Sequence, residues 1–241
     1  MQSLEHRIVS LGSRFAIRIV LMADKPDYHE DELEIVRQLD HPDRLVPSFE
    51  CVGKTILDVG CGIGQTLSAV EFAECSNRYG IDIDAVAIAK GCSTFPGLQL
   101  RVASAEALPF PDNMFDLTYS RVAVPYTNLE KSIAEMVRVT KEGGIVWVLL
   151  HSMRMEWSEL HAAVLNFSLK RLVDRMYVLA NSICFLLTWK CFARPWSGTF
   201  ESVQFERNFR RFMESGGLHS VRRLSDTRFC LYGIKGTKPK L

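Results

Sequence analysis

The stretch ILDVGCGIG, residues 56–64, decides the fold of this chain, because an apolar run passes directly into a glycine-rich turn. An apolar run of this kind suits a strand that is buried on both faces. Gly60, Gly62 and Gly64 follow the pattern GxGxG. Glycines let the chain turn sharply and let a ligand lie against bare backbone, with the N–H groups of a helix start nearby. The stretch therefore predicts a strand, a ligand-binding loop and a helix in succession.

On either side of this stretch, apolar runs alternate with amphipathic ones as far as residue 150. We expect strands at residues 54–60, 78–83, 98–102, 115–120 and 144–150. We expect helices at residues 64–74, 84–92 and 128–140, the last closed by a glycine turn at 141–144. Strands that alternate with helices predict βαβ units, and hence an α/β fold with a parallel, doubly wound sheet.

The flanks of this region show other patterns. Residues 1–50 read as one or two helices interrupted by prolines. Residues 155–193 read as a long helical insertion, and residues 201–215 as a further helix with one apolar stripe. The runs at 219–224 and 228–234 predict a closing pair of strands.

A second element, Gly80–Ile81–Asp82, ends the second predicted strand. An acid at this place can accept hydrogen bonds from both hydroxyls of a ribose. Asp82 follows Gly62 by 20 residues, a spacing that a nicotinamide-dinucleotide site would share. The dinucleotide fingerprint is GxGxxG, however, and here the third glycine comes one residue early. The two elements favour an adenosine-containing ligand and leave its identity open.

Two more segments, SAEALPFPDNMFDLTYS (104–120) and EMVRVTKEGGIVWVLL (135–150), complete a set of four motifs. In this order and spacing the four resemble the class I S-adenosylmethionine-dependent methyltransferases, above all the ubiquinone/menaquinone-biosynthesis type and its small-molecule relatives. The resemblance covers about residues 54–150. It implies a Rossmann-like, mostly parallel seven-stranded sheet with an antiparallel last strand, and S-adenosyl-L-methionine as the cofactor.

The resemblance also implies the parts of the chain. Residues 1–50 would form an N-terminal helical cap and residues 51–153 the Rossmann-like core that binds the cofactor. Residues 154–200 would form a helical insertion, or lid, after the fifth strand. Residues 201–241 would add the last helix and the closing strand pair to the core.

Residues in the first two motifs take cofactor roles from the resemblance. Asp58 and the loop of Gly60, Cys61 and Gly62 would hold the methionine end of the cofactor, with Asp58 as a partner for its ammonium group. Asp82 would bind the ribose. Ile83 would lie beside the adenine.

The later motifs add the other side of the same site. Ser104, Ala105 and Glu106 match the segment at the adenine edge, where this chain has Ser104 in place of the family's usual Asp. Arg121 follows the fourth strand, where the chain of the family wraps the cofactor.

Methyl transfer from a sulfonium is an in-line displacement, so the protein mainly supplies alignment and a dry pocket. An oxygen or nitrogen acceptor can also need a base. His151 directly follows the fifth predicted strand, and Tyr126 lies in the loop after the fourth. Both are candidate catalytic residues; the alternatives are a structural, hydrogen-bonded histidine and a tyrosine in the pocket wall.

The helical insertion is the candidate acceptor site. Its apolar segment could line a cavity for an apolar or aromatic small molecule. The same segment could instead form a homodimer interface or lie on a membrane surface; we favour the lid. The longest uncharged stretch, Met176 to Trp189, has 14 residues, fewer than the roughly 20 that a spanning helix needs. We therefore expect no transmembrane segment.

Other functions receive less support from the sequence. Amino-methylating enzymes of nucleic acids carry [DNS]PP[YFW] after the fourth strand, where this chain reads Ser120–Arg121–Val122–Ala123, and the chain has no Pro-Cys pair. A nucleic-acid partner is therefore not the expected one, and a nucleic-acid methyltransferase is kept as an alternative function. A nicotinamide-dependent oxidoreductase and a non-catalytic cofactor-binding protein remain as alternatives.

Charge is divided unevenly along the chain, although its formal net charge is +1. Residues 1–150 hold 14 basic and 21 acidic side chains, whereas residues 151–241 hold 15 basic and 7 acidic ones. The acidic part contains the predicted cofactor site and suits a cationic sulfonium. The basic part leaves open an anionic acceptor or a basic outer surface.

The seven cysteines bear on the cellular compartment. They are odd in number, form no CxxC pair and have no histidine at zinc-ligand spacing. This pattern predicts neither a disulfide framework nor a metal site, and favours a reducing cytoplasm. The charged N-terminal segment MQSLEHRIVSLGSRF predicts no secretion signal.

Overall fold

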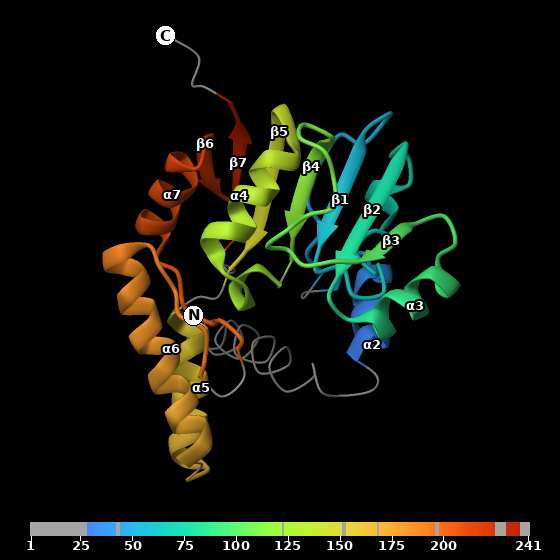
Figure 1. Ribbon diagram of the computed structural model, residues 1–241. Coiled ribbons are helices and arrows are strands. Elements are labelled where there is room, and N and C mark those ends of the chain that lie inside the picture. Colours follow the sequence, from blue (N-terminus) through green and yellow to red (C-terminus); the bar gives the residue numbers. More distant parts are fainter. Residues whose placement is uncertain are drawn as a thin grey trace, which may run out of the picture.

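The computed structural model describes residues 28–41, 44–121, 123–150, 153–167, 169–195, 198–224 and 230–236. Seven strands form one sheet in the order β3-β2-β1-β4-β5-β7-β6 (Figure 1). Their bounds are β1 Thr55–Val59, β2 Asn77–Asp82, β3 Gln99–Val102, β4 Phe115–Ser120, β5 Thr140–Leu149, β6 Leu218–Arg223 and β7 Cys230–Lys235. The first five strands are parallel, and β7 is antiparallel to both of its neighbours. The Rossmann-like α/β sheet with an antiparallel last strand is confirmed.

Helices cover both faces of this sheet (Figure 1). Their bounds are α2 Tyr28–Arg37, α3 Ala85–Thr94, α4 Leu129–Val139, α5 Met153–Leu165, α6 Leu169–Thr188 and α7 Glu206–Ser215, with short 3₁₀ helices η1 Val70–Phe72 and η2 Val124–Tyr126. Asp84 caps α3 by accepting from the N–H groups of Val86 and Ala87, and Asn128 caps α4 by accepting from that of Lys131. Such caps satisfy N–H groups that have no partner inside the helix.

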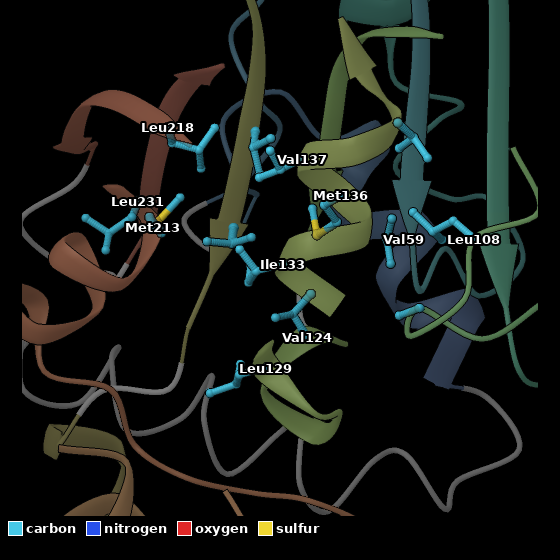
Figure 2. Packing of buried hydrophobic residues seen from close by; sticks show 14 of the residues in the cluster. Val59, Leu108, Val124, Leu129, Ile133, Met136, Val137, Met213, Leu218 and Leu231 are labelled. Carbon is cyan, nitrogen blue, oxygen red and sulfur yellow. The ribbon is translucent and has the colours of Figure 1, made fainter. Parts of the chain in front are cut away.

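The core lies in two layers because successive side chains of a strand point to opposite faces. Leu57 and Val59 of β1 pack on one face with α4 and α7, and Figure 2 shows Ile133 and Met136 of α4 in that layer. Ile56 of the same strand packs on the other face with residues of α2 and α3. With both faces covered, the carboxyl ends of the parallel strands are the place left for a ligand.

The expected helix at residues 64–74 is wrong. Turns follow the glycine loop, and only the short η1 is helical. The Ser68 hydroxyl donates to the carbonyl of Gln65 at 2.7 Å, and the Arg78 guanidinium donates to that of Leu67 at 3.2 Å. These side chains take backbone acceptors that a regular helix would use.

The expected glycine turn at 141–144 is also wrong. Helix α4 already ends at Val139, because the Thr140 hydroxyl donates to the carbonyl of Met136 at 2.6 Å. Strand β5 begins at Thr140 and contains Gly143, whose φ is 77°. The pairing of β4 with β5 shifts register in this region. The glycines thus bend a strand and do not end a helix.

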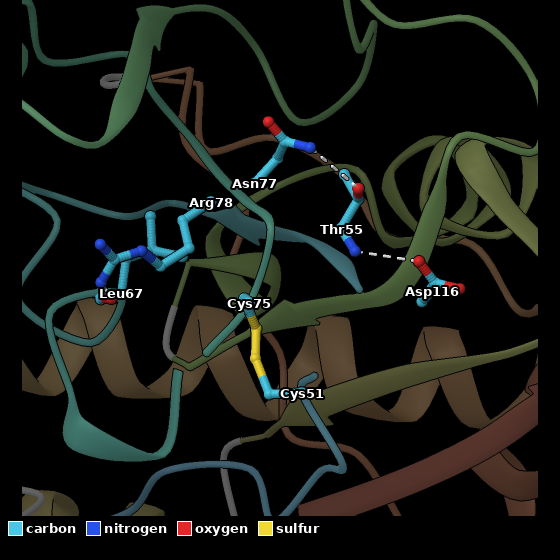
Figure 3. The surroundings of a disulfide bond; sticks show 7 residues. All are labelled: Cys51, Thr55, Leu67, Cys75, Asn77, Arg78 and Asp116. Atoms are coloured by element: carbon cyan, nitrogen blue, oxygen red, sulfur yellow. Dashed lines mark hydrogen bonds between the residues drawn. A yellow bond between two sulfur atoms is a disulfide. The ribbon is translucent and has the colours of Figure 1, made fainter. Parts of the chain in front are cut away.

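One pair of cysteines contradicts the expectation from the cysteine pattern. Cys51 and Cys75 form a disulfide, with their Cα atoms 4.8 Å apart (Figure 3). Val52 and Cys75 form an antiparallel bridge, which brings the segment before β1 beside the segment before β2. This proximity arises from the sheet and not from local spacing, so the sequence did not indicate it. The other described cysteines, Cys61, Cys92, Cys184, Cys191 and Cys230, are not part of a disulfide.

The helical insertion consists of α5 and α6. The two helices form a hairpin that projects beyond the end of the sheet (Figure 1). Among the residues described, no helix combines the length and the apolar character that crossing a bilayer requires.

Candidate active site

The glycine loop is held against the end of β2. The N–H groups of Gly60 and Cys61 both donate to the carbonyl of Ile81, at 2.8 and 2.9 Å. Gly60 has φ 80°, and a Cβ added to it would lie 2.0 Å from the Cβ of Ala123. Glycine is therefore needed at position 60 both for its conformation and for the close approach of the chain that follows β4.

The second glycine of the loop lies under helix α2. Gly62 has φ 57°, and a Cβ there would lie 2.9 Å from the ring of His29 and 3.1 Å from Oε1 of Gln65. The imidazole Nδ1 and the amide Oε1 are buried and have no hydrogen-bond partner among the described residues. Burial lowers the pKa of His29, although Asp82 opposes this shift. His29 is therefore neutral at pH 7 and can accept or donate a hydrogen bond.

Asp82 stands at the carboxyl end of β2 and shapes the loop. Its Oδ2 accepts from the N–H of Gly62 at 2.8 Å, and its Oδ1 accepts from the N–H of Asp84 at 3.0 Å. Each carboxylate oxygen has a second lone pair, so both can still accept from ligand hydroxyls. The next residue, Ile83, is 76% exposed. An apolar side chain this exposed, beside the acid, offers a flat aromatic ligand group a surface to pack on.

Asp58 is a buried acid at the end of β1. It pairs with Tyr119 of the neighbouring strand β4, and its Oδ1 has no hydrogen-bond partner among the described residues. Burial raises the pKa of Asp58 to about 7, although Tyr119 and Arg121 oppose the shift. A buried acceptor without a partner is costly. A ligand ammonium group at this place would relieve that cost.

Arg121 supplies the opposite charge. Its guanidinium forms an ion pair with Glu32 of α2, and both side chains are buried. Burial alone would lower the pKa of Arg121, but Glu32 more than offsets it, so the pKa is raised. The NH1 atom has no hydrogen-bond partner among the described residues. It is a buried donor that a ligand carboxylate would satisfy.

Several of the residues around the loop were missed by the sequence analysis. His29, Glu32 and Gln65 belong to no motif, and His29 and Glu32 lie in the segment before the core. Glu32 alone left a signal, because it falls on the apolar, buried side of α2 beside Leu33, Ile35 and Val36. A charge on the buried side of a helix calls for a partner.

Cys61 is not suited to act as a nucleophile. Its side chain is buried, and its Sγ lies 3.5 Å from the carbonyl oxygen of Gly62. Burial, and then Asp58 and Asp82, raise the pKa of the thiol well above its ordinary value. The thiol stays protonated, so Cys61 contributes its backbone to the loop.

The segment after β3 lies at the same edge of the sheet. The Ser104 hydroxyl accepts from the N–H of Glu106 at 3.2 Å, and Ala105 is buried. Glu106 accepts from the N–H of Asn128 at 3.0 Å and lies 3.9 Å from Lys131. Its carboxylate therefore braces the start of α4.

Of the two candidate catalytic residues, His151 and Tyr126, the structure describes only Tyr126. His151 lies outside the described residues. Tyr126 ends η2, and its carbonyl accepts from the N–H of Phe200 at 3.4 Å. Burial raises the pKa of the Tyr126 hydroxyl, Glu201 adds to the shift, and Arg175 opposes it. A hydroxyl that holds its proton this firmly is a poor general base.

An ionic cluster beside Tyr126 joins the insertion to the core. Arg175 of α6 donates to Glu156 of α5 at 3.1 Å and to Glu201 at 3.2 Å, and Arg194 pairs with Glu201. Glu156, Arg175 and Glu201 are buried. Buried pairs fix a geometry more than they add stability, so this cluster sets the position of the hairpin relative to the segment before α7.

The buried polar atoms without partners can be compared with the polar groups of S-adenosylmethionine, to see whether the cofactor fits this site. Among the described residues, five of them surround the loop and the ends of β1 and β4: His29 Nδ1, Asp58 Oδ1, Gln65 Oε1, Tyr119 OH and Arg121 NH1. The methionine end of the cofactor carries an ammonium donor and a carboxylate acceptor. The site offers acceptors and donors for both, so the residues present fit the group.

Comparison with known proteins agrees with this geometry. Residues 57–148 match the family described as a methyltransferase domain, which confirms the resemblance seen in the four motifs. Ajmaline N-methyltransferase from Rauvolfia serpentina is 37% identical over 105 residues, 41% of this chain and 36% of the relative. The 2-methyl-6-phytyl-1,4-hydroquinone methyltransferase of Synechocystis sp. is 36% identical over 100 residues, 40% of this chain and 31% of the relative. The chain thus spans about a third of the length of the curated relatives it matches.

Solved structures share the fold. A chain from the complex of the Haloferax volcanii Trm112 methyltransferase activator with a methyltransferase has a TM-score of 0.56 at 16% identity, over 95% of this chain and 97% of that one. The CurJ carbon methyltransferase has a TM-score of 0.52 at 14% identity, over 82% of this chain and 51% of that one. At these identities the likeness is one of fold alone.

Proposed function

We propose that this protein transfers a methyl group from S-adenosylmethionine to an oxygen or nitrogen atom of a small organic molecule. The match of residues 57–148 to the methyltransferase-domain family supports the proposal. The observation that carries the proposal is the set of buried polar atoms without partners around Asp58 and Arg121. In a folded protein such atoms are rare, and here they lie where parallel strands leave a ligand site.

The cofactor-binding roles are assigned as follows. Asp58 faces the ammonium group and Arg121 NH1 the carboxylate, with the backbone of Gly60, Cys61 and Gly62 between them. Asp82 accepts from the ribose hydroxyls, and Ile83 packs on the adenine. The backbone of Ser104 and Ala105 borders the adenine edge, and Glu106 holds that segment by bracing α4.

The chemistry needs alignment more than it needs an acid or a base. The bound cofactor supplies an activated methyl group on sulfur, which an acceptor atom attacks in line. The residues of the chain hold the reactants and exclude water, an effect worth several kcal/mol. Tyr126 lines the pocket, and His151 is the proposed base for acceptors that must lose a proton.

A small, apolar or aromatic acceptor is the class that we infer. The relatives above are named for ajmaline and for a phytylhydroquinone, and residues after 150 supply an apolar helical hairpin beside the site. A nucleic-acid acceptor has no comparable support. We propose the division into residues 1–50, 51–153, 154–200 and 201–241 on the same grounds, with the third part as the lid.

Calorimetry tests cofactor binding directly. S-adenosylmethionine is titrated into the purified wild-type chain, and saturable binding is expected. A chain whose melting temperature rises with NADH or NADPH, and not with S-adenosylmethionine, would contradict the proposal and favour an oxidoreductase.

Turnover is tested separately with methyl-labelled cofactor and a panel of apolar phenols, hydroquinones and amines. Labelled product together with S-adenosylhomocysteine is the expected outcome. Cofactor binding without turnover on any acceptor would favour a non-catalytic binding protein, and label in nucleic acid would overturn the acceptor class.

We propose a cytoplasmic location on the basis of the odd number and scattered spacing of the seven cysteines. The Cys51–Cys75 disulfide argues against this location, because a reducing compartment keeps cysteine thiols reduced. Alkylation of the protein in intact cells, followed by mass spectrometry, decides the matter. Both thiols alkylated would support the cytoplasm, and an intact disulfide would place the protein in an oxidising compartment.

A further inference from the structure

Helix α6 presents an apolar stripe on its outer side. Leu169, Val173, Met176, Ala180, Ile183 and Leu187 recur at i, i+4, i+7, i+11, i+14 and i+18 and are all exposed. This spacing places them on one side of the helix along its 20 residues. We name this set the outer stripe.

The outer stripe lies opposite the side by which α6 packs. The buried residues of the helix are Arg175, Val178, Asn181, Ser182 and Phe185, about half a turn away from the stripe. A helix on the surface of a domain normally turns polar residues to solvent. In α6 the buried side holds the polar Arg175, Asn181 and Ser182 as well as apolar residues, whereas the outer stripe is apolar along the whole helix. The outer stripe is therefore an interaction surface.

The apolar surface continues around the tip of the hairpin. Phe167, between α5 and α6, is 96% exposed, and Leu169 at the start of α6 is 74% exposed. Val164 and Leu165 at the end of α5 are exposed as well. The hairpin projects beyond the sheet (Figure 1), so its tip can enter a surface without hindrance from the core.

Cations lie at both ends of the outer stripe. Lys170 follows its first residue and Lys190 comes just after its last; both are exposed, and neither has an ion-pair partner among the described residues. Arg207 and Arg211 on α7 are exposed too, and α7 adjoins this end of α6 through a hydrogen bond of 3.2 Å from Trp189 to Asn208. Two acids also lie here, Asp174 near Lys170 and Glu130 near Lys190. The exposed cations named above outnumber them, so the charge around the apolar surface is net positive.

This charge decides between two occupants of the outer stripe. If two copies of the chain paired antiparallel along it, Lys170 of one copy would approach Lys190 of the other. If they paired parallel, each lysine would approach its own counterpart. Both arrangements place like charges together, whereas an anionic lipid surface complements them.

We propose that the α5–α6 hairpin binds the surface of a membrane that contains anionic lipids. The outer stripe and Phe167 enter the boundary between headgroups and acyl chains, as amphipathic helices do. Lys170 and Lys190 lie against the lipid phosphates. The proposal goes beyond methyl transfer and does not depend on it, because lipid binding requires no turnover.

Flotation with vesicles tests the proposal on the 241-residue chain. Wild type is expected to float with vesicles of phosphatidylcholine and phosphatidylglycerol, and to float less with phosphatidylcholine alone. Replacing Leu169 and Leu187 by Ser should lower the partition at least tenfold, since each loses the burial of a large apolar side chain. Replacing Lys170 and Lys190 by Gln should lower the partition onto the anionic vesicles about fivefold for each lysine removed.

The control variant is Leu39→Ser, which removes an exposed leucine (64%) beyond the end of α2. It should float like wild type. In a second measurement, tryptophan reporters are introduced as Phe167→Trp and Leu39→Trp. The emission of each reporter is the emission that it adds to that of the native tryptophans. Brominated lipids should quench the emission of the Phe167→Trp reporter and leave that of the Leu39→Trp reporter unchanged.

Three outcomes would overturn the proposal. One is a wild-type chain that does not bind anionic vesicles, and another is binding that the Leu169 and Leu187 double variant retains. The third is a dimer in light scattering that this variant dissociates while no vesicle binding occurs, which would assign the outer stripe to a second copy of the chain.

Discussion

Glu32 and Arg121 lie 89 residues apart in the sequence and form a buried ion pair at the carboxyl ends of the parallel strands. The pair joins α2 to the segment after β4 and leaves NH1 of the guanidinium without a hydrogen-bond partner among the described residues. The helix before the core therefore contributes directly to the proposed cofactor site.

The first prediction concerns this pair. Glu32→Ala leaves the Arg121 charge buried without its partner, which costs about 3–5 kcal/mol of unfolding free energy. Urea unfolding of both proteins measures the loss. Glu34→Ala, at an exposed position of the same helix, should change the free energy by less than about 0.5 kcal/mol. Equal effects of the two substitutions would show that the ion pair contributes nothing.

The second prediction concerns the ribose acid. Asp82→Ala removes both carboxylate oxygens from the N–H groups of Gly62 and Asp84 and from the proposed ribose hydroxyls. The Kd for S-adenosylmethionine should rise at least about 100-fold, since the ribose loses two hydrogen bonds to a charged group and each is worth roughly 1.5–3 kcal/mol. Calorimetry measures the change, and Asp84→Asn, which keeps the α3 cap, should bind like wild type. An unchanged Kd for Asp82→Ala would remove Asp82 from the ribose role.

The third prediction concerns pH. The folded-state pKa of Asp58, about 7, lies above its ordinary value of 3.8. Between these pH values the folded state binds more protons than the unfolded state, so the contribution of Asp58 to stability falls as pH rises. The full shift corresponds to a change on the order of 4 kcal/mol.

Urea unfolding at pH 5 and pH 8 measures this effect, with Asp58→Asn as the reference that cannot ionise. The stability of wild type relative to Asp58→Asn should decrease from pH 5 to pH 8. Cofactor binding should follow the opposite trend, because its ammonium group prefers the ionised carboxylate. A constant stability difference across this range would mean that Asp58 titrates near its ordinary pKa.

The fourth prediction compares two glycines with nearly equal φ. Gly60 (80°) would place a Cβ 2.0 Å from that of Ala123, whereas Gly143 (77°) would meet no atom within 4 Å. Gly143→Ala should cost only the conformational penalty, roughly 1–2 kcal/mol. Gly60→Ala should cost at least about 1 kcal/mol more, because it adds overpacking, and should also weaken cofactor binding. Thermal unfolding and calorimetry measure both; equal losses of stability would contradict the close approach to Ala123.

Local sequence patterns predicted the core well. The five parallel strands and helices α3 and α4 follow from apolar runs, capping residues and glycines, all of which act over a few neighbouring positions. The GxGxG loop and Asp82 at the end of β2 belong to the same kind of signal. For these parts the information lies within the segment itself, so no tertiary knowledge was required.

The parts that the sequence did not indicate depend on distant partners. Ser68 and Arg78 compete for the carbonyls of the expected helix at 64–74, and Cys51 meets Cys75 only through the sheet. The ionic cluster around Glu201 and the pair of Glu32 with Arg121 likewise join segments far apart in the chain. Periodicity cannot specify such pairs, because even where one member is unusual, as Glu32 is on the buried side of α2, the pattern does not name its partner.

The buried pair of Glu32 with Arg121 also crosses the limit of the region that matches known proteins. The part that comparison recognises, residues 57–148, contains the arginine and not the glutamate. A fragment cut at those limits would keep the guanidinium in its recess and lose its counter-charge, and it would lack β6 and β7 at one edge of the sheet. The segment that matches the family model is thus smaller than the segment that holds the buried charge pair, and a shortened chain would have to include α2 to keep that pair.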